Sequence, residues 1–148
     1  RLPHVCAANI TDTGWKDDVH PHDKKPVGER LAHAARRHVY GDTSCSRTPE
    51  FASATFRPGR AIVAFTADTP LRARGEGVGR GFELKVGGTW RPAAKAELVG
   101  GTVVVTSEGA DDAVEGVRYL WDSWDKPNVW LYDEQGIPVN SFSEPFEI

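Results

Sequence analysis

The stretch FASATFRPGRAIVAFT, residues 51–66, decides how most of this chain folds. Two segments rich in apolar and β-branched side chains, 51–57 and 61–66, flank the dipeptide Pro58-Gly59. Proline fixes a backbone angle that suits a turn, and glycine accepts a positive φ, so this dipeptide is typical of a tight connection between strands. The stretch therefore predicts a β-hairpin.

Shorter segments of the same kind follow the hairpin. We expect strands at 81–86, 96–99, 102–106, 117–121 and 129–132. The glycine pair at 100–101 predicts a second hairpin between two of these segments. Several short strands with turns at this spacing are typical of a small antiparallel β-sandwich domain, which we expect over residues 46–148.

A helix is expected before the strands, over residues 24–40, with Asp23 as its N-cap and Gly41 just after its end. Its apolar side chains recur with helical spacing and form one stripe, which a helix normally buries. The stripe consists of Val27, Leu31, Ala34, Ala35 and Val39. The segment GDTS at 41–44 looks superficially like the turn around a nucleophilic serine, but we interpret it as the helix exit.

The composition is that of an ordinary globular protein. The 148 residues are 39% hydrophobic and 26% charged, with a net charge of −3, which is unlike a disordered chain. This charge gives no basis for a nucleic-acid partner or for binding to an anionic membrane surface. Because no apolar run approaches the roughly 18 residues that cross a bilayer, we expect no membrane span.

The residues that suggest chemistry lie in the loop before the helix, DTGWKDDVHP at 12–21. Two carboxylates, Asp17 and Asp18, stand three and two residues before His20. A carboxylate that accepts from Nδ1–H fixes the imidazole tautomer, so that Nε2 can take a proton from a hydroxyl nucleophile. The pattern suits the base of a serine esterase, although surface aspartates beside a loop histidine show the same spacing.

This loop and the residues after it resemble the sialate O-acetylesterase family of the SGNH hydrolase superfamily. The family pattern is carried by Asp-x-Gly at 12–14, Asp-x-His-Pro at 18–21, Lys24, Val-Gly at 27–28 and Arg-Leu-Ala at 30–32. Further matches follow in the family's order at 81–84, 102–105, 117–121 and 136–138. The resemblance covers residues 8–142.

The resemblance implies that residues 1–45 are the C-terminal segment of an α/β SGNH-hydrolase domain, with its catalytic loop and last helix. His20 matches the family's catalytic histidine. Asp18 matches the family's Asp-x-His-Pro and Asp17 the superfamily's Asp-x-x-His, so either carboxylate is a candidate partner of His20. Trp15 departs from the acidic residue common after Asp-x-Gly, and it is a candidate for shaping the substrate pocket.

The implied function is a carbohydrate O-acetylesterase, in which a serine attacks the acetyl group of an O-acetylated sugar or sialoglycan and His20 acts as general base. No metal or organic cofactor is implied. None of the seven serines has the family's Gly-Asp-Ser or Gly-Gln-Ser context. We therefore expect the nucleophile on an N-terminal part of the same precursor, the partner of this chain. The alternative is a non-catalytic carbohydrate-binding or structural component derived from the family.

Four tryptophans in the strand region bear on that alternative. Trp90, Trp121, Trp124 and Trp130 offer aromatic faces that suit sugar rings. In a β domain of this size, however, large aromatic side chains supply much of the core. We expect at least two of the four to pack inside.

Two features indicate the secretory route, extracellular or lysosomal. Asn9-Ile10-Thr11 is an N-glycosylation sequon, so Asn9 is a candidate glycosylation site. Cys6 and Cys45 flank the loop and helix and allow one disulfide bridge. By closing a long loop, this bridge would stabilise the fold by about 3–4 kcal/mol.

Overall fold

The computed structural model describes residues 5–75, 79–122 and 129–146 of the chain. In these ranges a helix is followed by strands alone, as the sequence predicts. The elements are α1 (Lys25–His38), β1 (Glu50–Arg57), β2 (Arg60–Thr66), β3 (Arg72–Ala73), β4 (Phe82–Val86), β5 (Thr89–Pro92), β6 (Lys95–Val99), β7 (Thr102–Thr106), β8 (Val114–Tyr119), β9 (Leu131–Tyr132) and β10 (Phe142–Glu144). No helix among the described residues is long and apolar enough to span a membrane.

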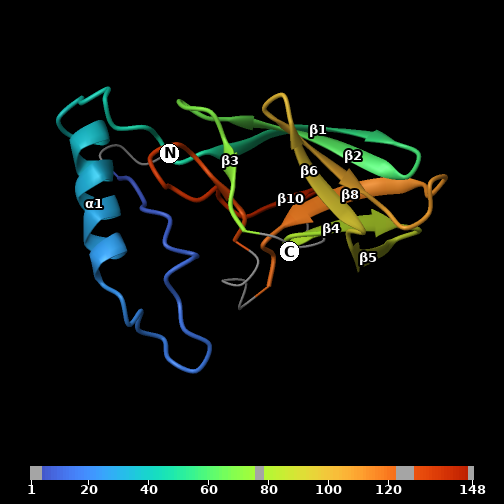
Figure 1. Cartoon of the computed structure of the whole chain (residues 1–148), viewed down its shortest axis with the longest axis horizontal. Helices are drawn as coiled ribbons and strands as arrows, with labels where there is room; N and C mark the ends of the chain where they lie inside the picture. The colour runs from blue at the N-terminus through green and yellow to red at the C-terminus, as the bar shows by residue number, and fades with distance from the viewer. Residues whose placement is uncertain (1–4, 76–78, 123–128, 147–148) are drawn as a thin grey trace.

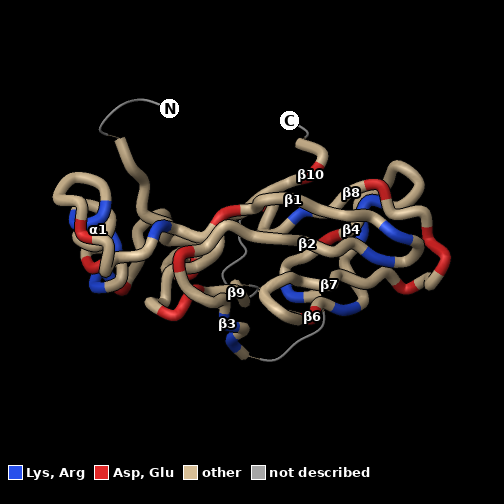
Figure 2. Tube along the Cα trace, turned by 90° about the horizontal axis from the view of Figure 1, so that it is seen from above, with Lys and Arg blue, Asp and Glu red and all other residues tan. Residues whose placement is uncertain are grey.

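The strands form two four-stranded antiparallel sheets, in the orders β1-β2-β7-β6 and β10-β8-β4-β5. A short antiparallel pair, β3 with β9, lies between these sheets and α1. Figures 1 and 2 show an elongated molecule with α1 at one end and the sheets at the other. The chain is therefore mostly antiparallel β-sheet with one short helix, and the predicted sheet type is confirmed.

Side chains from both sheets share one apolar core. Val63 of β2, Leu84 of β4 and Val117 of β8 are almost fully buried in it. Phe82 stacks on Tyr119 with ring centroids 4.5 Å apart. Burial of each such side chain contributes about 1.5–3 kcal/mol. The strands thus bury their apolar faces against one another without help from α1.

The hairpin predicted from residues 51–66 is present. β1 and β2 pair in antiparallel register around Pro58-Gly59. Gly59 has a φ of +69°, and a Cβ at this position would lie 2.3 Å from the carbonyl oxygen of Ala110, so only glycine fits the turn. The second predicted hairpin, between β6 and β7, is also confirmed.

The strands that differ from prediction are short or end at a residue with an unusual backbone conformation. β3, β5 and β10 have two to four residues each, too few for alternation of apolar and polar side chains to be recognised. The strand expected at 117–121 spans Val114–Tyr119 instead. Leu120 takes a φ of +49°, which ends the extended conformation after Tyr119.

The helix α1 is shorter than predicted, and its apolar side is only partly covered. It begins at Lys25, whose backbone N–H donates to Asp23 Oδ1 at 3.0 Å, and it ends at His38. Its N-cap is Lys24 and not the predicted Asp23. Leu31 and Val39 of the predicted stripe are 56% and 68% exposed, whereas the other three members of the stripe are half-buried. The stripe that a helix normally buries is therefore covered in part by the described residues.

Polar side chains of α1 face the rest of the chain. Arg30 donates to the carbonyl oxygen of Gly136 at 3.2 Å, and His33 Nε2 lies 2.9 Å from the carbonyl oxygen of Ser46. Ser46 in turn donates its hydroxyl to the buried carboxylate of Asp133. These hydrogen bonds link the helix to the segments that adjoin the sheets.

The environment of Asn9 gives no support to its predicted glycosylation. Asn9 is only 8% exposed, and its Nδ2 donates to the carbonyl oxygen of Pro138 and to Asn140 Oδ1, both at 3.0 Å. The hydroxyl of Thr11, the third sequon residue, donates to Asn9 Oδ1 at 2.9 Å. In this structure the amide of Asn9 is used for hydrogen bonds within the chain, and its glycosylation stays a prediction.

The predicted disulfide is absent, because Cys6 and Cys45 are both free thiols. Cys6 is exposed on the segment that precedes the loop. Cys45 is buried at the helix exit, where its Sγ lies 3.9 Å from Asp42 Oδ2. The thiol of Cys45 turns toward this carboxylate instead of a second sulfur. The predicted bridge is therefore wrong for this structure.

Candidate active site

The loop that carries His20 projects beyond the N-terminal end of α1, away from the sheets (Figure 1). It starts at Asp12 and returns to the helix at Lys25. Within it, the backbone N–H of Asp18 donates to the carbonyl oxygen of Trp15 at 3.4 Å. This turn folds the tip of the loop back on itself and presents its polar side chains outward.

Asp18 and His20 are held together by two contacts. The backbone N–H of His20 donates to Asp18 Oδ1 at 2.8 Å, and His20 Nδ1 lies 3.3 Å from the same oxygen. With Nδ1 directed at the carboxylate, Nε2 is left to take a proton from a hydroxyl group. The separation of 3.3 Å is long for this type of hydrogen bond, as catalytic hydrogen bonds often are before substrate binds. The side chain of His20 is 78% exposed.

His22 is a second imidazole on the same carboxylate. Its Nε2 lies 3.2 Å from Asp18 Oδ2, and its ring stacks on Trp15 with centroids 4.5 Å apart and planes 16° apart. Trp15 therefore lies beside the Asp18–His20 pair, and it stays a candidate for shaping the pocket. The sequence pattern did not single out His22 as a catalytic residue. Within the described residues, no group of three His, Cys, Asp or Glu side chains is arranged to hold a metal ion.

These contacts stabilise the ionised form of Asp18. The backbone N–H of His20, and after it the side chain of His22, lower the pKa of Asp18 below its ordinary value. An ionised carboxylate accepts a hydrogen bond from Nδ1–H and stabilises an imidazolium beside it. Asp18 thus has the charge that an orienting partner of His20 needs.

Asp17, the other candidate carboxylate, is exposed and lies one residue earlier in the loop. In the part of the chain that the structure describes, Asp17 makes no hydrogen bond or ion pair with His20. The turn in which Asp18 accepts from the backbone N–H of His20 instead brings the carboxylate of Asp18 to the imidazole of His20. Of the two alternatives left open by the sequence, the geometry favours Asp18.

None of the serines that the structure describes forms a hydrogen bond with His20. Ser44 donates its hydroxyl to Asp42 Oδ1 at 2.6 Å, and Ser46 donates to Asp133. The GDTS segment that contains Ser44 follows the last turn of α1, so its interpretation as the helix exit is confirmed.

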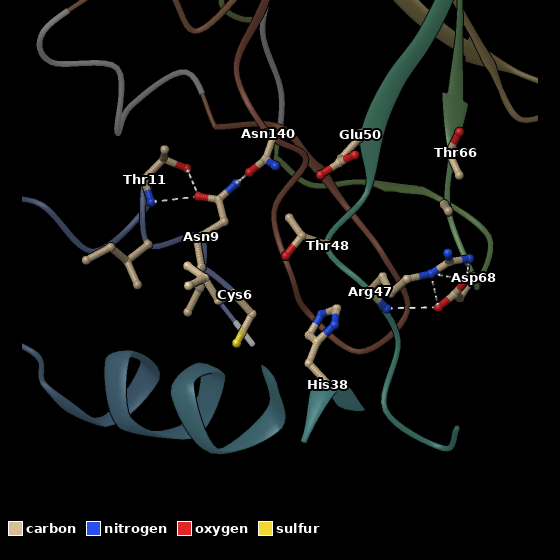
Figure 3. A pocket seen from close by; sticks show the side chains of 15 residues that line it. Cys6, Asn9, Thr11, His38, Arg47, Thr48, Glu50, Thr66, Asp68 and Asn140 are labelled. Carbon is tan, nitrogen blue, oxygen red and sulfur yellow. Dashed lines mark hydrogen bonds and ion pairs between the residues drawn. The ribbon is translucent and has the colours of Figure 1, made fainter. Parts of the chain in front are cut away.

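A cavity of about 840 Å³ lies at the opposite end of α1 from His20 (Figure 3). It is lined by His38 at the end of the helix, by Cys6 and its neighbours, and by Arg47. Arg47 forms an ion pair with Asp68 at 2.6 Å across one wall. No predicted residue of the catalytic loop lines this cavity, so it is separate from the candidate active site.

The described tryptophans are occupied by contacts within the strand region. Trp130 is buried in the core, edge-on to an aromatic ring of β4. The face of Trp90 is covered by the guanidinium of Arg118, 4.6 Å from the ring centroid. Trp121 packs against Phe146 with centroids 6.1 Å apart, and the fourth tryptophan, at position 124, lies outside the described residues. Of the three described tryptophans of the strand region, Trp130 alone is buried in the core. The sequence predicts at least two of the four there.

Neither the known family models nor the curated proteins include a match to this chain. A solved structure does. The chain is similar to a carbohydrate acetylesterase from Xanthomonas citri. The two share 36% sequence identity and superpose with a TM-score of 0.80.

The similarity to the acetylesterase covers 92% of this chain and 31% of that protein. It therefore extends over both parts of this chain, the loop with α1 as well as the sheets. The chain spans less than a third of the acetylesterase's length. Similarity at this level supports a relation to carbohydrate esterases in general.

Proposed function

We propose that this chain is the C-terminal part of a carbohydrate O-acetylesterase of the sialate O-acetylesterase type within the SGNH superfamily. The observation that carries the proposal is the similarity, at 36% identity over 92% of the chain, to a carbohydrate acetylesterase. The contact between His20 and Asp18 supports it independently, since a carboxylate-held imidazole is the general base of serine esterases.

In the proposed reaction, a serine hydroxyl loses its proton to His20 Nε2 and attacks the acetyl carbonyl carbon. Asp18 accepts from His20 Nδ1–H and stabilises the imidazolium that forms. The imidazolium then protonates the sugar oxygen as its bond to the acetyl carbon breaks, which leaves an acetyl-serine. Water, deprotonated by His20, releases acetate and restores the serine. Trp15, whose ring stacks on His22, is the proposed residue that shapes the pocket for the sugar.

In this proposal, the serine belongs to an N-terminal part of the same precursor, and this part also covers α1. The exposed apolar side chains of Leu31 and Val39 support such a covering partner, and so does Val19, which is 93% exposed in the loop. Burial of each would contribute about 1.5–3 kcal/mol. Since the loop and α1 lie at the same end of the molecule (Figure 1), one partner can cover the helix and bring a serine to His20.

The proposed substrate is an O-acetylated sugar, with a sialoglycan as the family type. The proposed location in the secretory route, extracellular or lysosomal, rests on the family resemblance alone. Neither the buried amide of Asn9 nor the free thiols of Cys6 and Cys45 support that location.

The test is acetate release by the complete protein that contains this chain, assayed on O-acetylated sialic acid and on acetylated xylose. We expect release that a serine-directed phosphonate abolishes. Asp18→Asn should lower kcat by up to about 10⁴-fold, because an amide favours the wrong imidazole tautomer. Asp17→Asn, one residue away in the same loop, is the matched control and should have a mild effect.

Three results would count against the proposal. Equal and mild losses from both asparagine variants would remove Asp18 from its role. Acetate release that resists the phosphonate would exclude a serine nucleophile. A complete protein that binds the acetylated sugars but releases no acetate would be the non-catalytic carbohydrate-binding component.

A further inference from the structure

A partly buried charge pair holds the root of the loop that carries His20. Arg30 of α1 makes two parallel hydrogen bonds to the carboxylate of Asp12, including one of 2.8 Å from Nη2 to Oδ2. The side chains of Arg30 and Asp12 are only 13% and 18% exposed. Arg30 also donates to the carbonyl oxygen of Asn9 at 3.1 Å. A bidentate pair of this kind fixes orientation as well as distance, and here it joins the start of the loop to the helix that follows it.

A third side chain reaches the same root from the β-sheet region. The hydroxyl of Tyr132 in β9 donates to Asp12 Oδ2 at 3.2 Å. The hydroxyl of Tyr119 in β8 accepts from the two backbone N–H groups just before Tyr132, at 3.1 and 3.2 Å. Because Tyr119 is fully buried in the core, this contact fixes β9 to the sandwich. Tyr132 therefore ties the root of the loop to the sheets.

The electrostatics of the root favour one protonation state for each group. Burial raises the pKa of Asp12, but the hydrogen bonds and positive charge of Arg30 outweigh this effect, so the pKa lies below its ordinary value. Burial, and after it the negative charge of Asp12, raises the pKa of Tyr132. The root thus consists of a carboxylate, a guanidinium and a neutral phenol, which keep their hydrogen bonds through the pH range in which histidines titrate.

The tip of the loop is joined to the rest of the chain through this root. The contacts of Asp18 with His20 and His22 lie within the tip and hold its residues to one another. Because the loop leaves and re-enters the body of the protein at the root, a displacement of the root moves the tip relative to the sheets and α1. A displacement of about 1 Å in a catalytic group can cost about 10²-fold in rate.

We propose that Asp12, Arg30 and Tyr132 are positioning residues for His20. They fix the root of the loop so that His20 Nε2 meets the serine, and they give the β-sandwich a part in catalysis through Tyr132. This inference rests on the proposed esterase function. It concerns how the base is placed and leaves the chemical steps unchanged.

The test compares variants of the complete protein in acetate release from an acetylated sugar. Tyr132→Phe removes one hydroxyl and should lower kcat about 10-fold, while Asp12→Asn should lower it about 100-fold. KM should stay near the wild-type value in both, because the sugar contacts are untouched. The double variant should lose little beyond Asp12→Asn, since both changes break the same contact.

The matched control is Gln135→Ala. Gln135 also links the helical part to the sheet region, with Nε2 donating to the carbonyl oxygen of Ser44 at 2.8 Å and Oε1 accepting from Ser46 N at 3.1 Å. These contacts lie at the helix exit, at the other end of α1 from His20. Gln135→Ala should lower the melting temperature at least as much as Tyr132→Phe and leave kcat unchanged. That split separates positioning from a general loss of stability.

The outcomes distinguish this inference from the proposed function. Wild-type kcat in Tyr132→Phe, or equal kcat losses in Tyr132→Phe and Gln135→Ala, would overturn the positioning role while the esterase function stands. A wild-type protein without serine-dependent acetate release would overturn the function itself. If Asp12→Asn fails to fold because Arg30 is left unpaired, Tyr132→Phe decides alone.

Discussion

The β-sandwich and the helix α1 differ in the exposure of their large apolar side chains. In the sandwich, side chains such as Leu84 and Val117 point inward and are almost fully buried. In α1, Leu31 and Val39 are largely exposed, while Arg30 and His33 face the rest of the chain and form its hydrogen bonds. By this measure the sandwich buries its own apolar side chains, whereas the helical part leaves two of them exposed, and we propose that the N-terminal part of the precursor covers these.

The residues that stabilise the fold and the candidate catalytic residues therefore lie in different parts of the chain. The residues with the strongest claim to chemistry lie at the uncovered end, on a loop whose tip is exposed (Figure 1). The residues that bury the most apolar surface lie at the other end. Substitutions at the two ends should therefore act on different measurements, and four predictions test this.

The largest expected effect is on turnover. His20→Ala in the complete protein should lower kcat for an acetyl ester by at least about 10³-fold, because the serine loses its general base. The melting temperature should hardly change, since the side chain is exposed. His38→Ala, at the other end of α1, is the control and should retain full turnover. If His20→Ala keeps more than a tenth of the wild-type rate, the substitution raises the activation barrier by less than about 1.4 kcal/mol and His20 is not the base.

Next in size is a loss of stability in the sandwich. Leu84→Ala should lower the free energy of unfolding by about 3 kcal/mol, through lost burial and the cavity left behind. The loss should be similar for residues 1–148 alone and for the complete protein, because the core of the sandwich is supplied by its own strands. Chemical denaturation of both forms measures it. A much smaller loss in the isolated chain would mean that the sandwich needs the partner as well.

The same substitution in the helix should depend on context. Leu31→Ala should change the stability of the isolated chain by less than about 0.5 kcal/mol, as is usual for an exposed site. In the complete protein we expect a loss of about 2 kcal/mol, because the proposed N-terminal part then covers the side chain. Denaturation curves of the two forms give the comparison directly. Equal, small losses in both would contradict the proposed cover over α1.

The smallest effect concerns pH. Hydrogen bonds from the side chain and backbone of Arg47 lower the pKa of Asp68 from 3.8 to about 2. A carboxyl group with a depressed folded-state pKa stabilises the fold above its unfolded pKa, and this contribution is lost as the pH falls through the folded value. Asp68→Asn should therefore lower the melting temperature at pH 7, and the difference from wild type should vanish near pH 2. A difference that persists at pH 2 would come from packing rather than charge.

The strands were predictable from sequence where the alternation of apolar and polar side chains extends over enough residues. The hairpin at 51–66 and its turn glycine were correctly predicted, because β-branched segments and a Pro-Gly turn act locally. The two-residue strand β3 carries no such signal, and the strand expected at 129–132 is reduced to Leu131–Tyr132 of β9, since the pairing of β3 with β9 depends on residues some 60 positions apart. The end of β8 was misplaced because the positive φ of Leu120 follows from its surroundings rather than from its residue type.

The candidate site was predictable in part. Asp18, His20 and Trp15 are local to one loop, so a motif could single them out, and the structure brings them together. Tyr132 could not be found in this way, because it lies 120 positions from Asp12 in the sequence. The error at the two cysteines, and the lack of support for glycosylation of Asn9, have the same origin: a sequon or a pair of thiols in the sequence does not show which side chains become buried.

The hydrogen bonds that link Tyr132 to Asp12, and Arg30 to the carbonyl oxygen of Gly136, also bear on when the site can form. A ribosome makes the loop and Arg30 early, but Tyr132 and Gly136 emerge more than a hundred positions after their partners. Contacts this far apart in sequence close slowly, since chain entropy must be lost before they are made. The root of the loop can therefore form completely only after residue 136 has left the exit tunnel. A shorter nascent chain contains His20, the proposed general base, on a loop whose root is not yet fixed.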